Sequence, residues 1–198
     1  MKSKKGGSKI KKKKAYGWIV KVSLLTFVLA ILMSTLSEAV LRNVALVPAL
    51  SVLLLIILVG VTSDTIGIAV AAAKEQPFHS MAAQNIPSAR YSVNLVRNAG
   101  PVSNFCNDVI GDIAGIVSGA AIAIILVQIM ELGLPFVNLA TLSVVLSGVV
   151  ASITVGGKAI GKELALSNWE GIVGFVGKVL YLLDYKFHIR ILKDVKRR

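Results

Sequence analysis

The sequence predicts an all-α integral membrane protein with four transmembrane helices, a helical cytoplasmic insert and a C-terminal basic amphipathic helix. Of its 198 residues 55% are hydrophobic, and the mean hydropathy is +0.76. Only 16% are charged, whereas a soluble domain carries about 25%. The apolar residues fall in four runs long enough to cross a hydrocarbon core of about 30 Å, which requires roughly 20 helical residues. This composition disfavours a soluble enzyme core and a disordered chain.

The N-terminal part divides into a basic cytoplasmic tail, residues 1–15, and a first transmembrane helix with its outer loop, residues 16–43. Lys21 lies near the cytoplasmic end of this helix, where a long side chain can extend to the membrane surface. A cleavable signal peptide is the competing interpretation, because a basic start and an apolar stretch precede the small residues of 34–39. The length of the apolar stretch favours a retained helix.

Residues 44–165 form the main predicted transmembrane domain, with spans at about 44–73, 108–131 and 134–157. The cytoplasmic insert, residues 74–107, is polar and is interrupted by three prolines, so we expect short helices separated by turns. Residues 166–198 form a basic juxtamembrane segment in which apolar residues recur at helical spacing. Such a helix suits the membrane surface, and packing against the protein's own cytoplasmic insert is the alternative.

The basic residues predict the orientation of the chain. Of the 22 lysines and arginines, eight lie within residues 1–14, and eleven lie from Lys158 to the C-terminus or at Lys74 and Arg97. Because Lys and Arg are enriched in cytoplasmic segments, we expect a multi-pass protein of the cytoplasmic (plasma) membrane with both termini in the cytoplasm. The net charge of +12 does not indicate nucleic-acid binding, since no patch interleaves aromatic with basic residues. The single cysteine, Cys106, excludes an intramolecular disulfide.

Two carboxylates lie next to apolar runs. Asp64 follows the second span, and the chain stays apolar through residues 66–73, while Asp112 opens the third span. An ionised carboxylate at membrane depth costs a few kcal/mol or more, so it is expected to face a cavity, a partner or an ion. Gly115 and Gly119 share a helical face with Asp112 and would let another helix approach closely.

Small and hydroxylated residues form a stripe on the fourth span, at Ser143, Ser147, Ala151 and Thr154. Such stripes are packing surfaces more often than ligand sites. If this face meets the corner at residues 63–65, hydroxyl, carboxylate and carbonyl oxygens would converge there, and such hard donors suit Mg²⁺, Ca²⁺ or Na⁺. Gln128 and Asn138, near the outer side, are expected to form hydrogen bonds between helices.

Signatures of soluble catalysis are absent from the sequence, which contains no GxSxG elbow, phosphate-binding P-loop or HExxH motif. Two aspartates raise the alternative of an intramembrane protease, but the GxGD motif typical of such enzymes is missing. The run Ile110-Gly111-Asp112 matches it only in part. We therefore predict that the protein is not an enzyme, has no catalytic residues and uses no organic cofactor.

Three short runs resemble the transmembrane domain of the CorC/CorB/CNNM family of magnesium transporters. Ser63-Asp64-Thr65 is similar to the Ser-Glu-Thr-Ala-like run that ends one span of that family. Ile110-Gly111-Asp112 is similar to the Ile-Gly-Asn run that opens the next span. Residues 157–162 are a weaker match to the Gly-Glu-x-x-Pro-Lys run, with Lys158 in place of Glu and Gly161 in place of Pro. The resemblance covers roughly residues 44–165.

The resemblance implies a homodimer that holds a largely dehydrated Mg²⁺ between helices. Carried over by position, it implicates Ser63, Asp64, Gly111 and Asp112 as metal ligands. The family commonly carries cytoplasmic CBS domains that bind ATP, which are not found in this sequence, and a separate cytoplasmic regulatory chain is one way to supply them.

The expected function is therefore that of a transporter or exporter-like protein for divalent cations, foremost Mg²⁺ with Co²⁺ as a second candidate. Its expected partners are the lipid bilayer, the cation and a second copy of the chain. The alternative is a non-transporting membrane scaffold or accessory subunit, which would act through helix packing and its basic cytoplasmic ends. The sequence leaves transport direction and any coupling ion open.

Overall fold

The computed structural model describes residues 5–133 and 138–187, with side-chain surroundings for residues 20–133 and 138–186. Over these residues the chain is helical throughout and contains no strand. The elements in chain order are α1 (Lys5–Leu41), α2 (Leu46–Ala72), α3 (Gln76–Ala83), α4 (Ala89–Arg97), α5 (Ala99–Asn104), the π-helical turn η1 (Phe105–Gly111), α6 (Asp112–Glu131), α7 (Leu139–Ser167) and α8 (Trp169–Phe187).

Four helical segments are long and apolar enough to cross a membrane, which confirms the predicted fold class. They are Val20–Leu41, Leu46–Ala72, Ala99–Glu131 and Leu139–Ser167. In the third of them α5, η1 and α6 follow one another without a break. The protein is thus a multi-pass membrane protein whose apolar helices are suited to contact with lipid.

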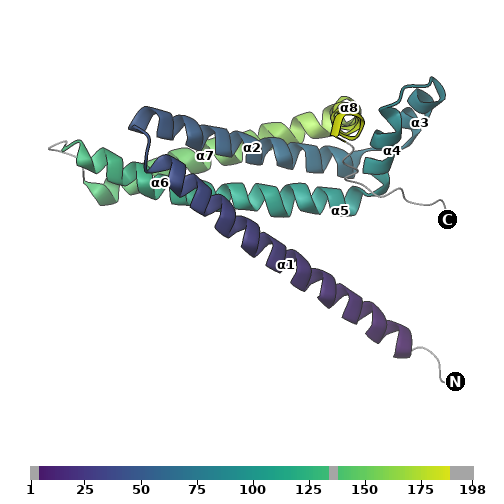
Figure 1. Cartoon of the computed structure of the whole chain (residues 1–198), viewed down its shortest axis with the longest axis horizontal. Coiled ribbons are helices and arrows are strands. Elements are labelled where there is room, and N and C mark those ends of the chain that lie inside the picture. The colour runs from purple at the N-terminus through teal and green to yellow at the C-terminus, as the bar shows by residue number, and fades with distance from the viewer. Residues whose placement is uncertain (1–4, 134–137, 188–198) are drawn as a thin grey trace.

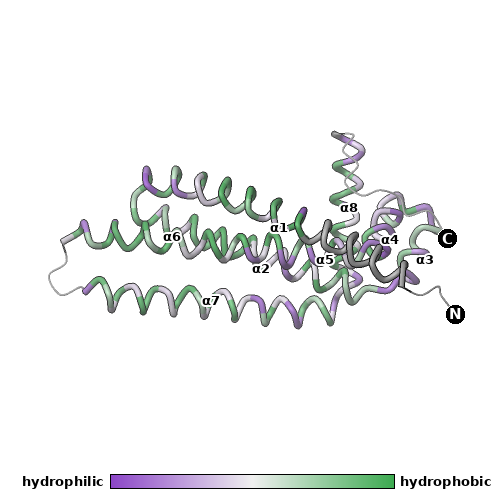
Figure 2. Tube along the Cα trace, turned by 90° about the horizontal axis from the view of Figure 1, so that it is seen from below, coloured by the Kyte–Doolittle hydropathy of each residue, from purple (hydrophilic) through white to green (hydrophobic). Residues whose placement is uncertain are grey.

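The helices form a bundle around α2 (Figure 1). There α2, α6 and α7 run alongside one another, and α1 crosses α6 obliquely. One end of the bundle, here called the turn end, carries the α1–α2 and α6–α7 connections. The opposite end, the cap end, carries α3, α4 and α8, and α8 lies across the direction of the bundle (Figure 2). Hydrophilic residues gather at the cap end, whereas α2, α6 and residues 20–41 of α1 are largely hydrophobic.

Two main apolar cores hold the bundle together. Toward the turn end, residues of α2, α6 and α7 pack around the fully buried Ala49, Ala121 and Ile125. At the cap end, the fully buried Phe78 and Val173 join the end of α2 to α3, α4 and α8. Burial of an aliphatic or aromatic side chain contributes about 1.5–3 kcal/mol relative to exposure, so each core fixes its end of the bundle independently of the polar groups between them.

Helix boundaries depend on local hydrogen bonds. The Asn138 side chain accepts a hydrogen bond from the backbone N–H of Ala140 at 2.9 Å and so caps α7. Asn138 therefore acts within one helix rather than between helices. Gln128 of α6 does join separate elements, because its Nε2 donates to the carbonyls of Leu41 and Val44 at 2.9 and 3.0 Å.

The fourth span extends further than residue 157. α7 continues to Ser167, so the run at residues 157–162 lies inside this helix instead of after it. The helix persists because its Gly157 and Gly161 pack against α2 and its Ala165 is buried in the cap-end core. α8 packs on α4 through the buried Val173, as the alternative interpretation of the basic segment expects. The remainder of that segment, residues 188–198, lies outside the described residues.

Candidate functional site

A cluster of polar groups lies between α2, η1 and α7. At its centre the Asp64 carboxylate forms an ion pair with the Lys158 ammonium group, with 2.7 Å between Oδ2 and Nζ. The Asp64 side chain is 13% exposed and that of Lys158 is 35% exposed. Asp64 lies 18 residues beyond the start of α2, which corresponds to about 27 Å along a helix. Since a hydrocarbon core is about 30 Å thick, the pair lies close to the cap-end limit of the length that α2 needs to cross it.

Pairing explains how two charges are tolerated at this depth. Removing an ion from water costs several kcal/mol, and an opposite charge at hydrogen-bond distance compensates much of that cost. Lys158 lies 19 residues into α7, or about 28 Å along the helix, so the two charged groups reach the same level from neighbouring helices. Charges inside membrane proteins characteristically pair in this way and mark pathways or functional sites.

The π-helical turn approaches α2 at two glycines. A Cβ at Gly111 of η1 would collide with Oδ1 of Asp64, and a Cβ at Gly67 of α2 would collide with Oδ1 of Asn107. These side chains therefore lie directly against the facing backbone, in space that only glycine leaves open. Single π-helical turns within α-helices often occur at functional sites.

The Ser63 hydroxyl and a carbonyl oxygen of η1 belong to the same contact as the Asn107 amide. The Ser63 hydroxyl donates a hydrogen bond of 2.9 Å to the carbonyl oxygen of Cys106 in η1. The Asn107 Oδ1 atom is buried and has no hydrogen-bond partner among the described residues. A buried acceptor without a partner costs about 1–3 kcal/mol, so a hydrogen-bond donor or a cation next to this amide oxygen would be stabilising.

α7 joins the cluster through small residues. Its Gly157 faces the Val61 side chain of α2, and a Cβ at Gly161 would collide with Oγ1 of Thr65. This close approach brings Lys158 within reach of Asp64. The Thr65 hydroxyl itself donates to the carbonyl of Val61 at 2.8 Å, so Thr65 serves the packing of α2 on α7.

The structure brings together three of the four residues predicted as metal ligands. Ser63 and Asp64 are buried on the face of α2 that meets η1, and Gly111 is buried opposite them. Asp112 is the first residue of α6 and is exposed, because one residue along a helix turns the side chain by about 100°.

The prediction that another helix approaches closely at Gly115 and Gly119 has a different outcome. A Cβ at Gly115 or Gly119 would meet no atom within 4 Å. Among the described residues no other helix approaches this face of α6 at these two positions, although both residues continue the helical face of Asp112. The close contact occurs one turn earlier, at Gly111.

Sequence reasoning missed Lys158 and Asn107 as members of the cluster. Lys158 stood out only as a departure from a family motif, although a lysine within an apolar span is itself a signal that an acidic partner lies at the same depth. Gly60, Ser63 and Gly67 recur at helical spacing and could have identified the face of α2 that another backbone approaches. The π-helical turn has no comparable signal in the sequence, so Asn107 was not predictable.

The chemistry of the cluster is that of hard oxygen donors. A carboxylate, a side-chain amide, a hydroxyl and a backbone carbonyl come from Asp64, Asn107, Ser63 and Cys106. Among the described residues, no three His, Cys, Asp or Glu side chains lie close enough together to hold a metal ion. The donors of this cluster other than Asp64 are neutral. An incoming cation would therefore compete with the Lys158 ammonium group for the one carboxylate.

A second polar group of residues fixes the cap end. Arg97 Nε donates to Glu75 Oε2 at 3.0 Å, and His79 Nε2 lies 3.0 Å from the same oxygen. The hydrogen bond from His79, helped by Arg97, holds the pKa of Glu75 below its ordinary value of 4.5. Nearby, the Tyr91 hydroxyl donates to Asp184 and so links α4 to α8. These contacts are at the surface and position the short helices.

No protein-family model, curated protein or solved structure matches this chain.

Proposed function

We propose that this protein is a membrane transporter for divalent cations, with Mg²⁺ as the first candidate and Co²⁺ as the second. The observation that carries the proposal is the buried Asn107 Oδ1 atom, which has no hydrogen-bond partner in the described part of the chain and lies at the same contact between η1 and α2 as the Asp64 carboxylate. Mg²⁺ prefers oxygen ligands, including carboxylates. The resemblance of residues 44–165 to the CorC/CorB/CNNM transmembrane domain supports the same ion.

Lys158 has a defined role in this proposal. Its ammonium group neutralises Asp64 when no ion is bound, and an arriving cation takes its place beside the carboxylate. Such an exchange keeps the net charge of the cluster low in both states, which is favourable in a low-dielectric environment. Because the Lys158 side chain is 35% exposed, it has room to withdraw toward the cap end.

The proposal includes an orientation and an assembly. The basic residues of the cap end favour a cytoplasmic location for that end under the positive-inside rule. Asp112, Gly115 and Gly119 are exposed, and a Cβ at either glycine would meet none of the described residues within 4 Å. A carboxylate beside small residues on a membrane helix suits contact with a second copy, so we propose a homodimer through this face. A separate cytoplasmic regulatory chain, if it is a partner, would bind at the cap end.

Ion flux into proteoliposomes tests the transport function. We expect Mg²⁺ uptake by the wild-type protein and at least a tenfold reduction in two variants: Asp64→Asn, which removes the negative charge and one carboxylate oxygen, and Asn107→Leu, which removes the amide oxygen. Asp108→Asn is the matched control, because Asp108 is exposed on η1 and its loss leaves the cluster intact. Flux that is absent from the wild type, or that is unchanged in Asp64→Asn, would refute the proposal.

The Asp64–Lys158 pair also favours a second candidate function, a non-transporting membrane scaffold. In that case the pair simply joins α2 to α7, and its replacement by apolar residues of similar volume is neutral or stabilising. The double variant Asp64→Leu with Lys158→Met distinguishes the two functions. A scaffold keeps its stability and its assembly, whereas a transporter keeps its fold and loses flux.

A further inference from the structure

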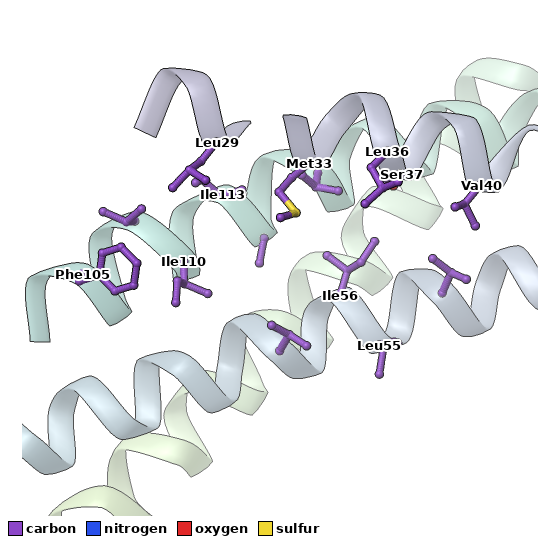
Figure 3. A pocket seen from close by; sticks show the side chains of 15 residues that line it. Leu29, Met33, Leu36, Ser37, Val40, Leu55, Ile56, Phe105, Ile110 and Ile113 are labelled. Atoms are coloured by element: carbon purple, nitrogen blue, oxygen red, sulfur yellow. The ribbon is translucent and has the colours of Figure 1, made fainter. Parts of the chain in front are cut away.

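An apolar cavity separates α1 from α2 and the start of the third span (Figure 3). Its volume is 530 Å³, and almost all of its lining is hydrocarbon. Side chains of α1 such as Leu29 and Met33 face Ile56 of α2 and Ile110 of η1 across the gap. Gaps of this size are not left empty in packed proteins, whose interiors contain few voids larger than a water molecule. Because the cavity lies among membrane-spanning segments, its natural filler is hydrocarbon.

One polar group lines the cavity near the turn end. The Ser37 residue is 9% exposed, and its Oγ atom is buried without a hydrogen-bond partner among the described residues. Other hydroxyls on these helices, such as those of Thr35 and Ser51, donate to the carbonyl four residues earlier at 2.8 and 3.1 Å. Ser37 is thus a free hydroxyl donor at one end of an apolar cavity.

The cavity is elongated. The lining residues of α1 extend from Leu29 to Val40, a rise of about 16 Å. A long apolar space of this kind suits an extended hydrocarbon chain, and a helix of a second copy is the competing occupant that the experiment below tests.

We propose that this cavity binds one acyl chain of a glycerolipid, whose ester carbonyl accepts a hydrogen bond from the Ser37 hydroxyl. The headgroup then lies at the turn end, where Arg42 and Glu38 form an exposed ion pair of 2.6 Å. The bound chain fills the space between α1 and α2, beside the direct apolar contact that Leu29 of α1 makes with η1 and α6. The site is independent of the polar cluster and of the proposed transport function.

Native mass spectrometry of the detergent-purified full chain tests the site. The probes are dioleoyl phosphatidylethanolamine and dioleoyl phosphatidylglycerol, each compared with its diether analogue, which lacks the ester carbonyl. We expect one tightly retained lipid and a preference for the ester of about two- to tenfold, as for one hydrogen bond of 0.5–1.5 kcal/mol. The two headgroups show which charge the turn end prefers.

Two variants locate the lipid. Ser37→Ala should retain the lipid and lose the preference for the ester, whereas Ser51→Ala should keep it. Ile110→Trp should fill the cavity and reduce lipid retention at least tenfold, while Val144→Trp on the exposed face of α7 should not. Circular dichroism confirms that each variant is folded. An ester preference that survives Ser37→Ala, or lipid retention unchanged in Ile110→Trp, would overturn the assignment. So would a wild-type protein that carries a second copy of the chain instead of a lipid and loses that copy in Ile110→Trp.

Discussion

At the level of the polar cluster and the apolar cavity, α2 meets the third span and α1 in opposite ways. Toward the third span it presents Gly60, which faces Ala114 of α6, and Gly67, which faces Asn107 of η1, so closely that a Cβ at either glycine would collide with the side chain opposite. Toward α1 it presents apolar side chains across a cavity of 530 Å³. The first contact contains the buried polar groups, and the second contains a single hydroxyl.

The comparison shows where a membrane protein can place polar atoms. A carboxylate at this depth requires a partner within hydrogen-bond distance, and the close approach of α7 to α2 supplies one for Asp64. An apolar gap has no such requirement, because lipid chains are as apolar as the side chains that line it. Each prediction below alters one side of this comparison.

The largest expected effect follows from leaving Asp64 without its partner. Lys158→Met should lower the free energy of unfolding by about 3 kcal/mol, the lower end of the range for breaking a buried pair, since Lys158 is 35% exposed. Unfolding in mixed micelles measures it. Lys162→Met, at an exposed position one turn later, is the control. An unchanged stability in Lys158→Met would mean that the pair is not formed in the membrane.

Filling the space at a close glycine should have the next largest effect. Gly67→Ala places a methyl group where Asn107 lies, and overpacking of this kind costs about 1–3 kcal/mol. The control is Gly115→Ala, where nothing lies within 4 Å and the higher helix propensity of alanine should stabilise the protein slightly. Equal thermal stability of the two variants would contradict the close contact of α2 with η1.

A smaller effect is expected at the turn end. Gln128→Met removes both hydrogen bonds to the α1–α2 connection. It also removes the buried Oε1 atom, which has no partner among the described residues. The net loss should therefore be about 1 kcal/mol, measured by thermal unfolding with the exposed Gln84→Met as control. A loss above about 3 kcal/mol would show that this connection determines how α1 packs.

The smallest effect concerns pH and the cap end. The pKa of Glu75 is lower in the folded protein than its ordinary value of 4.5. Its contribution to stability is therefore present above that value and is lost as the pH falls through the folded pKa. Melting temperatures between pH 6 and 3 should show a slight fall that Glu75→Gln removes and Glu131→Gln, at an exposed site, retains. A pH dependence that persists in Glu75→Gln would assign it to another group.

The sequence predicted the parts of the fold that follow from length and hydropathy. The four spans and the short helices of the insert depend on apolar runs and prolines, which are local properties of the chain. The end of α7 could not be placed in the same way, because the helix continues past residue 157 by packing Gly161 and Ala165 against other elements. Tertiary contacts of this kind leave little trace in composition.

The candidate site was predicted in part for a related reason. Ser63 and Asp64 were identifiable because polar residues at membrane depth are rare. The separation of Gly111 from the exposed Asp112 depends on helix rotation at a π-helical turn, which the sequence does not reveal. The cavity beside α1 was not predictable, since it depends on how far α1 lies from α2.

The most direct test of the polar cluster is the melting temperature of the purified protein titrated with Mg²⁺, with Co²⁺, Ca²⁺ and Na⁺ in parallel. An ion that binds only the folded state adds roughly 2.7 kcal/mol at 100 times its dissociation constant. We expect a saturable, Mg²⁺-selective rise in the wild type that is lost in Asp64→Asn and Asn107→Leu and retained in Asp108→Asn. A response that is flat for every ion in the folded wild-type protein, or equal in all four proteins, would contradict a cation site between α2 and η1.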